Sequence, residues 1–200
     1  ENRCTKIDES IDSDLASLFG CAITTGFGVV ENNAKIKMGE SVVVFGAGGV
    51  GLNIIQASQL NSAYPIIAVD IFENRLNLAR TLGATHLVNS SKSDPFEKIG
   101  EILEGNKPDV FIDNTGNNKI IEKGFTLINN NGRLILVGVP RKGNNINIFS
   151  LPLHFGKIIT GSHGGETNPT YDIPRYLKLF EQNITLYRSI ITERCQLNQI

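Results

Sequence analysis

The 200-residue sequence has little excess charge of either sign, no paired cysteines and no long apolar run. Its 19 Lys and Arg nearly balance its 20 Asp and Glu, which argues against a nucleic-acid partner or an anionic lipid surface. The most apolar stretch, 42–52, is rich in glycine and shorter than the roughly 18 residues of a membrane span, so no membrane segment is predicted. With 40% hydrophobic residues and 7 Pro, the composition is that of a globular protein rather than a disordered or collagen-like chain.

The three cysteines, Cys4, Cys21 and Cys195, stand singly. They form no C-x-x-C pair, and no secretory leader is recognisable at the front of the sequence, which favours a reducing, cytoplasmic setting. The sequence opens on Glu1 rather than Met, and its first residues are typical of the interior of a protein. We therefore expect a piece of a longer chain.

Short runs of β-branched residues alternate with amphipathic stretches from about residue 40 onward. This alternation predicts an α/β fold with a doubly wound, six-stranded parallel sheet of the Rossmann type. Farther along, Asp172 and Pro174 are typical of a helix start, and apolar residues at helical spacing follow them. The six predicted strands are 41–46, 65–70, 85–89, 109–115, 133–139 and 157–163.

A glycine-rich turn comes directly after the first predicted strand. The sequence Phe-Gly-Ala-Gly-Gly-Val-Gly follows three valines, so a G-x-G-x-x-G pattern ends a strand and opens a helix. Gly46 permits the tight turn, Gly48 lets a diphosphate approach the backbone, and Gly51 permits close packing of helix on strand. The amides of Gly49 and Val50 are expected to point from the helix N-terminus toward the anion. The turn therefore predicts a dinucleotide site.

An acidic residue ends the second predicted strand. Asp70 follows the turn at about the 20-residue distance where a dinucleotide fold places a carboxylate against the adenosine ribose. A carboxylate there repels a 2′-phosphate, so the sequence predicts NAD rather than NADP. Arg75 is a candidate for a second contact to the ribose.

Other chemistries that use glycine-rich turns fit less well. The turn lacks Lys followed by Ser or Thr, which excludes a triphosphate-binding loop. No tyrosine is followed four residues later by lysine, which argues against the short-chain reductases that share this fold. A methyltransferase, which also uses a glycine-rich first turn, stays open, as does a glycine-rich turn without a ligand.

Taken together, the motifs resemble the zinc-dependent alcohol dehydrogenases of the medium-chain dehydrogenase/reductase family. The likeness runs nearly end to end, but it covers only the second, coenzyme-binding half of such an enzyme. The segments that carry it are Leu-Phe-Gly-Cys-Ala-Ile-Thr-Thr-Gly-Phe-Gly at 18–28, the glycine turn, Val69-Asp70 with Arg75, Leu-Gly-Ala-Thr at 82–85 and Val-Gly-Val-Pro at 137–140.

The resemblance implies further site residues. Cys21 matches a thiolate ligand of the catalytic zinc, which polarises the substrate oxygen while hydride passes to the nicotinamide. Thr25 matches a residue beside the nicotinamide, and Thr115 and His163 match positions that line the cofactor cleft. The segment Val137, Gly138, Val139 matches backbone that binds the carboxamide.

The sequence also departs from the family pattern. The other two catalytic zinc ligands, the proton relay and the four-cysteine structural-zinc lobe have no counterpart, and one thiolate does not build a zinc site. We therefore expect the chain to bind NAD without oxidising an alcohol by itself, and assign no catalytic residue to it.

The resemblance also implies an organisation. We expect the tail of a GroES-like catalytic domain at 1–22, an NAD-binding Rossmann domain at 23–163 and a return segment at 164–200. The family pairs through the sixth strand, which implies a homodimer, and the parent would interconvert a small alcohol and its aldehyde or ketone. A zinc-free medium-chain reductase and a non-catalytic NAD-binding module are the alternatives.

Overall fold

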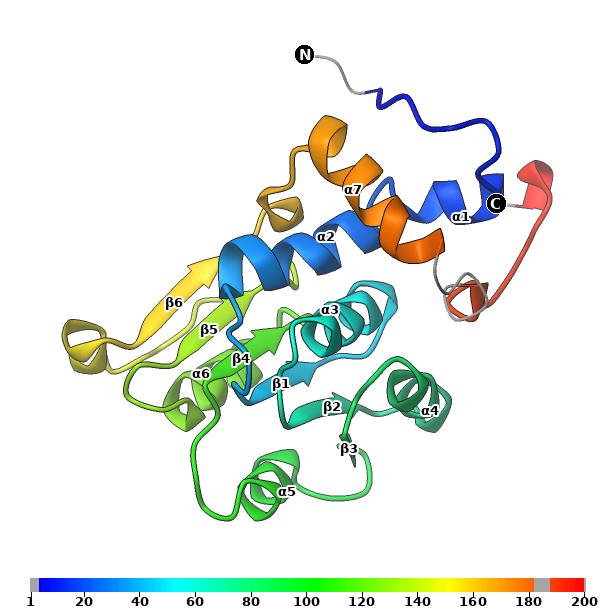
Figure 1. The fold of residues 1–200 in the computed structure, drawn as a ribbon. Helices are drawn as coiled ribbons and strands as arrows, with labels where there is room; N and C mark the ends of the chain where they lie inside the picture. The colour runs from blue at the N-terminus through cyan, green and yellow to red at the C-terminus, as the bar shows by residue number, and fades with distance from the viewer. Residues whose placement is uncertain (1–3, 182–187, 200) are drawn as a thin grey trace.

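The computed structural model describes residues 4–181 and 188–199, and within them a parallel sheet of six strands forms the centre of the fold (Figure 1). The order β3-β2-β1-β4-β5-β6 reverses direction beside β1, as in a doubly wound fold. The predicted fold class is confirmed, and each predicted strand is present. The strands are β1 (Val42–Phe45), β2 (Ile66–Asp70), β3 (His86–Asn89), β4 (Val110–Asp113), β5 (Arg133–Leu136) and β6 (Ile158–Gly161).

Helices cover both faces of this sheet (Figure 1). The α-helices are α1 (Ser13–Leu18), α2 (Ala22–Gly28), α3 (Gly49–Leu60), α4 (Glu73–Thr81), α5 (Pro95–Ile102), α6 (Asn118–Leu127) and α7 (Pro169–Glu181). A π-helical turn, η1 (Val29–Ala34), continues α2, and short 3₁₀ turns form η2 (Leu151–Phe155), η3 (Gly164–Glu166) and η4 (Leu197–Gln199).

The sheet separates two apolar cores. Successive strand side chains point to opposite faces, so Val42 and Val44 of β1 pack with α2, α3, α4 and α7, whereas Val43 and Phe45 pack with α5 and α6. Burial on both faces explains why the central strands read as continuous β-branched runs instead of alternating with polar residues.

Several predicted strands end earlier than expected, and the fourth shows why. Its predicted range was 109–115, but β4 stops at Asp113, whose carboxylate accepts hydrogen bonds from the backbone N–H groups of Thr115 (3.1 Å) and Gly116 (2.9 Å). A side chain that binds its own following backbone turns the chain out of the sheet. The residues after the strand thereby become the loop that lines the site.

The segment after the sheet returns to pack beside α2 (Figure 1). Its helix, α7, begins at Pro169 rather than near Asp172, so Pro174 lies inside the helix instead of opening it, and that expectation was wrong. Asp172 accepts a bond from the backbone N–H of Asn168 (2.7 Å). The apolar face predicted for this helix is buried. On this face, the ring centroids of Phe180 and Phe19 are 5.0 Å apart.

The predicted division at residues 22 and 163 stays a prediction. In the structure, α1, α2 and α7 share one apolar core with the sheet. The two predicted outer segments, 1–22 and 164–200, include residues 1–3, 182–187 and 200, which lie outside the described residues.

An ionic cluster ties α7 to η1. The Arg175 guanidinium donates to both carboxylate oxygens of Glu31, at 2.8 and 2.6 Å, and the Tyr176 hydroxyl donates to the same carboxylate at 3.0 Å. The hydrogen bonds from Arg175 lower the pKa of Glu31 below its ordinary value of 4.5, against the opposing effect of burial.

This lowered pKa predicts an acid-sensitive contribution to stability. Because Glu31 ionises more readily in the folded chain, its contribution is present above about pH 4.5 and is lost as the pH falls through the lowered pKa. We expect Glu31→Gln to reduce the free energy of unfolding near pH 7 by roughly 0.5 kcal/mol, since the paired groups are partly exposed. Denaturant titrations should show a smaller difference from the wild type at pH 3. Glu193→Gln is the control, because Glu193 is exposed. If the difference in unfolding free energy between Glu31→Gln and the wild type is as large at pH 3 as at pH 7, the lowered pKa of Glu31 is contradicted.

Candidate functional site

The glycine turn lies between β1 and α3, at the carboxyl end of the sheet. Gly46 has φ +95°, a left-handed conformation that strongly favours glycine. A Cβ on Gly51 would lie 2.0 Å from the Gly46 carbonyl oxygen, so helix and strand approach too closely for a side chain there. A Cβ on Gly48 would meet nothing within 4 Å. Two glycines therefore build the turn, and the third leaves space beside it.

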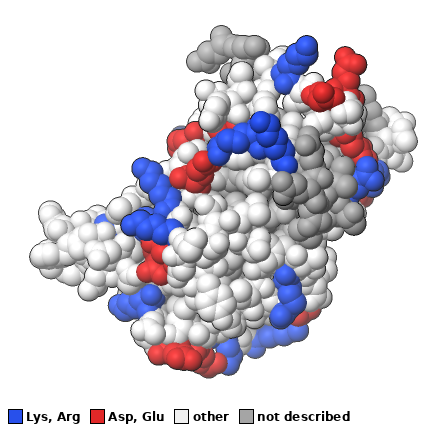
Figure 2. Space-filling model, viewed as in Figure 1, with Lys and Arg blue, Asp and Glu red and all other residues white. Residues whose placement is uncertain are grey.

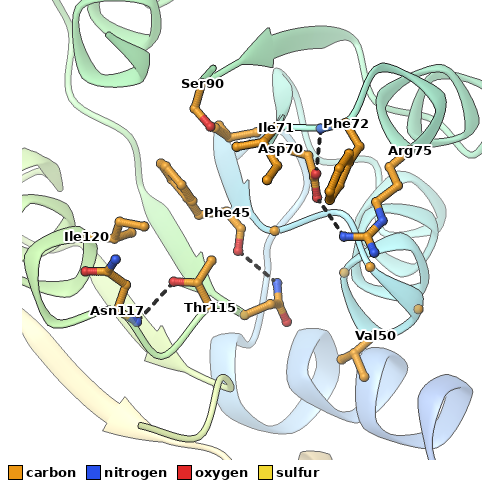
Figure 3. Close-up of a pocket in the computed structure, with 16 residues that line it drawn as sticks. Phe45, Val50, Asp70, Ile71, Phe72, Arg75, Ser90, Thr115, Asn117 and Ile120 are labelled. Carbon is orange, nitrogen blue, oxygen red and sulfur yellow. Dashed lines mark hydrogen bonds and ion pairs between the residues drawn. The ribbon is translucent and has the colours of Figure 1, made fainter. Parts of the chain in front are cut away.

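A pocket of about 580 Å³ opens beside this turn (Figure 3). Its position at the carboxyl ends of the strands, where their order reverses, is where open α/β sheets bind ligands. The predicted residues that the pocket brings together are Gly46, Gly48, Gly49, Val50, Gly51, Asp70, Arg75 and Thr115. The N-terminus of α3 gives this wall a positive field, because its first amides have no partner within the helix.

Asp70, at the end of β2, forms the neighbouring wall and binds the turn directly. One carboxylate oxygen accepts from the Ala47 amide of the turn at 2.8 Å, and the other accepts from the Phe72 amide at 3.0 Å. The residue is only 6% exposed. A guanidinium nitrogen of Arg75 lies 3.7 Å from the Asp70 carboxylate. The same guanidinium stacks on the Phe72 ring, 4.8 Å from its centroid. The sequence predicted Asp70 as a ligand contact, but not that it also anchors the turn.

The loop after β4 forms the third wall. Buried Asp113 accepts from the Thr115 hydroxyl at 2.6 Å in addition to the two backbone bonds, so it holds the loop and does not reach the pocket. Burial raises the pKa of Asp113, although these hydrogen bonds act in the opposite direction. The position of Asp113 therefore fits a structural role in this loop better than direct contact with a ligand.

The segment after β5 lies beside this wall without lining the pocket. The amides of Val137 and Gly138 donate to the Asp113 carbonyl at 2.8 and 2.9 Å. A Cβ on Gly138 would lie 2.2 Å from the Gly116 nitrogen, so the two loops are in close contact. Val139 is 90% exposed, and the predicted carboxamide contacts of this segment stay a prediction.

Thr25 and His163 do not line the pocket. They belong to two segments that contact each other, α2 and the turn after β6. A Cβ on Gly165 would come within 2.7 Å of the Thr25 carbonyl oxygen, so the turn after β6 packs directly on α2. His163 is exposed, and its backbone N–H donates to the Glu166 carboxylate at 3.1 Å. Their predicted cofactor contacts stay predictions.

Cys21 is exposed and lies just before α2. Its neighbour Ala22 has a Cβ 3.9 Å from where a Cβ on Gly49 would stand, so this thiol lies at the end of α2 that meets the turn. Cys4 and Cys195 are exposed too. Among the described residues, no three His, Cys, Asp or Glu side chains come together as a metal site would require.

Sequence reasoning missed half of the pocket wall. The missed residues are Phe45, Val69, Ile71, Phe72, Ser90, Asn114, Asn117 and Ile120. Four of the eight lie at strand ends: Phe45 ends β1, and Ile71, Ser90 and Asn114 directly follow β2, β3 and β4. The parallel order of the strands brings those ends together. The sequence did offer a signal for Ile71 and Phe72, because these two apolar residues directly follow the acidic end of the strand. In the structure, both side chains are about half exposed.

The molecular surface agrees with the balanced charge of the sequence. Figure 2 shows both signs interspersed on the face drawn, without a continuous basic area. In the described part of the chain, no helix has the length and apolar character needed to span a bilayer.

Solved structures share this architecture. Benzyl alcohol dehydrogenase from Acinetobacter calcoaceticus superposes with a TM-score of 0.86 at 34% identity, over 92% of this chain and 51% of that chain. An alcohol dehydrogenase zinc-binding domain protein from Burkholderia ambifaria gives a TM-score of 0.85 at 33% identity, over 92% of this chain and 50% of that one.

Curated sequences point the same way. The S-(hydroxymethyl)glutathione dehydrogenase of Saccharomyces cerevisiae is 32% identical over 97% of this chain and 52% of its own length. Alcohol dehydrogenase-like 7 of Arabidopsis thaliana is 31% identical over 98% of this chain and 51% of its own length. The chain thus spans about half the length of these relatives.

The family described as zinc-binding dehydrogenase matches residues 49–182, most of the chain. The chain belongs to this zinc-binding alcohol dehydrogenase family and represents its coenzyme-binding half. The resemblance drawn from the sequence is confirmed.

The glycines of the turn give a matched pair of variants. We expect Gly51→Ala to lower the free energy of unfolding by about 1–3 kcal/mol, because the added methyl group meets the backbone oxygen of Gly46. Gly48→Ala should leave stability within about 0.5 kcal/mol of the wild type, since its φ is −76° and the methyl group would enter open space. Urea denaturation measures both, and equal losses would contradict the packing described.

Proposed function

We propose that this chain binds NAD in the pocket beside the glycine turn, as the coenzyme half of an alcohol dehydrogenase. The observation that carries the proposal is that an open space beside Gly48 and a buried carboxylate at Asp70 belong to the same pocket. The nicotinamide of bound NAD would supply the hydride acceptor.

The residues present fit the two ends of the adenosine diphosphate. The open space at Gly48 admits the diphosphate to the N-terminus of α3, where the helix field favours an anion. Asp70 already accepts two backbone bonds, and its remaining acceptor capacity suits ribose hydroxyl groups. The half-exposed Ile71 lines the same wall and offers an apolar surface to the adenine ring.

The negative charge of Asp70 supports NAD over NADP. A 2′-phosphate would bring about two further negative charges next to a nearly buried carboxylate, and Arg75 only partly offsets them from 3.7 Å. The side chains of Thr25, Thr115 and His163, with the backbone of Val137, Gly138 and Val139, would hold the nicotinamide half, by the family resemblance.

The described residues do not fit a complete zinc site. Cys21 supplies one thiolate, whereas a catalytic zinc takes three protein ligands. We therefore propose zinc only for a longer parent chain that includes the other half, and assign no step to it here. The parent would act on a small alcohol or aldehyde, in the cytoplasm, where the three exposed thiols stay reduced.

We also propose a homodimer formed through β6, which lies at the edge of the sheet. Ile158 on this strand is 48% exposed and Phe155 just before it is 72% exposed, which leaves an apolar edge uncovered.

Cofactor binding is tested by NADH fluorescence titration of the wild type, Gly48→Ala and Asp70→Asn. We expect Gly48→Ala to weaken NADH binding at least tenfold, because the methyl group occupies the space of the diphosphate. Asp70→Asn should reduce the preference for NADH over NADPH at least tenfold, and the ratio of the two Kd values cancels any general effect on the turn. An unchanged ratio, or a wild type that binds neither dinucleotide, would overturn the proposal.

Zinc content separates the parent from this half. After dialysis against a weak chelator, the 200-residue chain should retain far less than one equivalent of zinc, and Cys21→Ser should not change that amount. A longer chain with the other half should retain zinc and lose it with Cys21→Ser. Full zinc retention by the short chain, or by the longer chain with Cys21→Ser, would be incompatible with this assignment. A longer wild-type chain that retains no zinc would favour the zinc-free reductase alternative.

A further inference from the structure

Phe72 lies between β2 and α4 and directly precedes the first turn of α4. This position favours Ser, Thr, Asp and Asn, whose side chains accept from the first helix amides, whereas the Phe72 side chain makes no capping hydrogen bond. In the described part of the chain, neither apolar core includes Phe72, and the residue is 50% exposed. Helix capping and core packing therefore both fail to explain an aromatic residue at this position.

The Phe72 ring carries the guanidinium of Arg75 on its face. Arg75 lies three residues farther along, on the next turn of the helix, and its guanidinium carbon is 4.8 Å from the ring centroid, within the range of a cation–π contact. The Arg75 side chain is 47% exposed, and an ion pair holds such a long, exposed side chain only weakly. Stacking of the planar guanidinium on the ring is therefore the contact that restricts it.

The ring holds this guanidinium beside Asp70. A guanidinium nitrogen, Nη1, is 3.7 Å from the Asp70 carboxylate, a separation at which opposite charges attract without a hydrogen bond. Asp70, Phe72 and Arg75 all line the same pocket, and Figure 3 shows the three side chains together at its wall. The half-exposed guanidinium thus presents its N–H groups next to the carboxylate, at a surface that a ligand reaches.

A carboxylate and a guanidinium side by side complement the hydroxyl groups of a ribose. Ionised Asp70 only accepts hydrogen bonds, whereas Arg75 only donates them. A hydroxyl group does both, so a ribose that donates to Asp70 keeps oxygen lone pairs that accept from Arg75. The second contact requires that the guanidinium stay beside the carboxylate instead of extending into the solvent.

Resting on the proposed NAD site, we propose that Phe72 is a positioning residue for the adenosine ribose. Its ring holds Arg75 beside Asp70, where the guanidinium donates to the ribose hydroxyl groups that Asp70 accepts from. Phe72 then contributes to cofactor affinity through Arg75, without touching the ligand itself.

The test combines substitutions at both positions with NADH fluorescence titration. Phe72→Leu keeps an apolar side chain without the aromatic face, and we expect it to raise the Kd for NADH about two- to fivefold. Phe72→Tyr keeps the face and should stay within about twofold of the wild type. In an Arg75→Met background, where no guanidinium is left to hold, Phe72→Leu should cause no further change. Phe149→Leu is the matched control, because Phe149 is 73% exposed and does not line this pocket, and it should leave the Kd unchanged.

Competition by adenosine locates the contact. Adenosine carries the ribose hydroxyl groups without a phosphate charge, so Phe72→Leu should weaken its displacement of NADH by the same factor of about two to five. An unchanged Kd for NADH in Phe72→Leu, an equal loss with and without Arg75, or a loss for NADH that adenosine does not share would overturn the role of Phe72. A wild type that does not bind NADH would instead overturn the proposed function, and this inference with it.

Discussion

The approach of α3 to β1 is the constraint on which the rest of the structure depends. A helix whose backbone passes so near the Gly46 carbonyl directs its N-terminus to the carboxyl edge of the sheet. That direction gives the pocket its positive wall, and the reversal of strand order beside β1 opens the space in front of it. Packing and electrostatics are thus set by the same few backbone atoms.

Two acidic residues end the strands on either side of β1, and they have different roles in the site. Asp70 and Asp113 both bind the backbone that follows them, yet only Asp70 lines the pocket. Asp113 is fully buried and shapes the loop from behind, where burial raises its pKa. Two residues of one type therefore differ in role because one carboxylate faces the ligand space and the other faces its own loop.

The sequence predicted the sheet and the turn because both rest on local patterns. β-branched runs mark the strands, and the spacing of Gly46, Gly48 and Gly51 marks the turn. It did not predict Asn114 or Ser90, because neither has a local signature, and both reach the pocket only through the parallel order of the strands. The start of α7 was misplaced because Pro174 is typical of a first turn, whereas packing against Phe19 and Phe27 supports a longer helix.

In the proposed NAD site, the bond between Asp70 and the Ala47 amide would link recognition of the ribose to the shape of the turn. A carboxylate with both duties cannot be exchanged freely, since a replacement that tolerates a phosphorylated sugar also removes an anchor of the diphosphate cradle. Redesign of this chain for the phosphorylated coenzyme would therefore need a compensating acceptor for the Ala47 amide before any basic residue is added. Evolution toward the other coenzyme would face the same two-step path, with the intermediate binding both dinucleotides poorly.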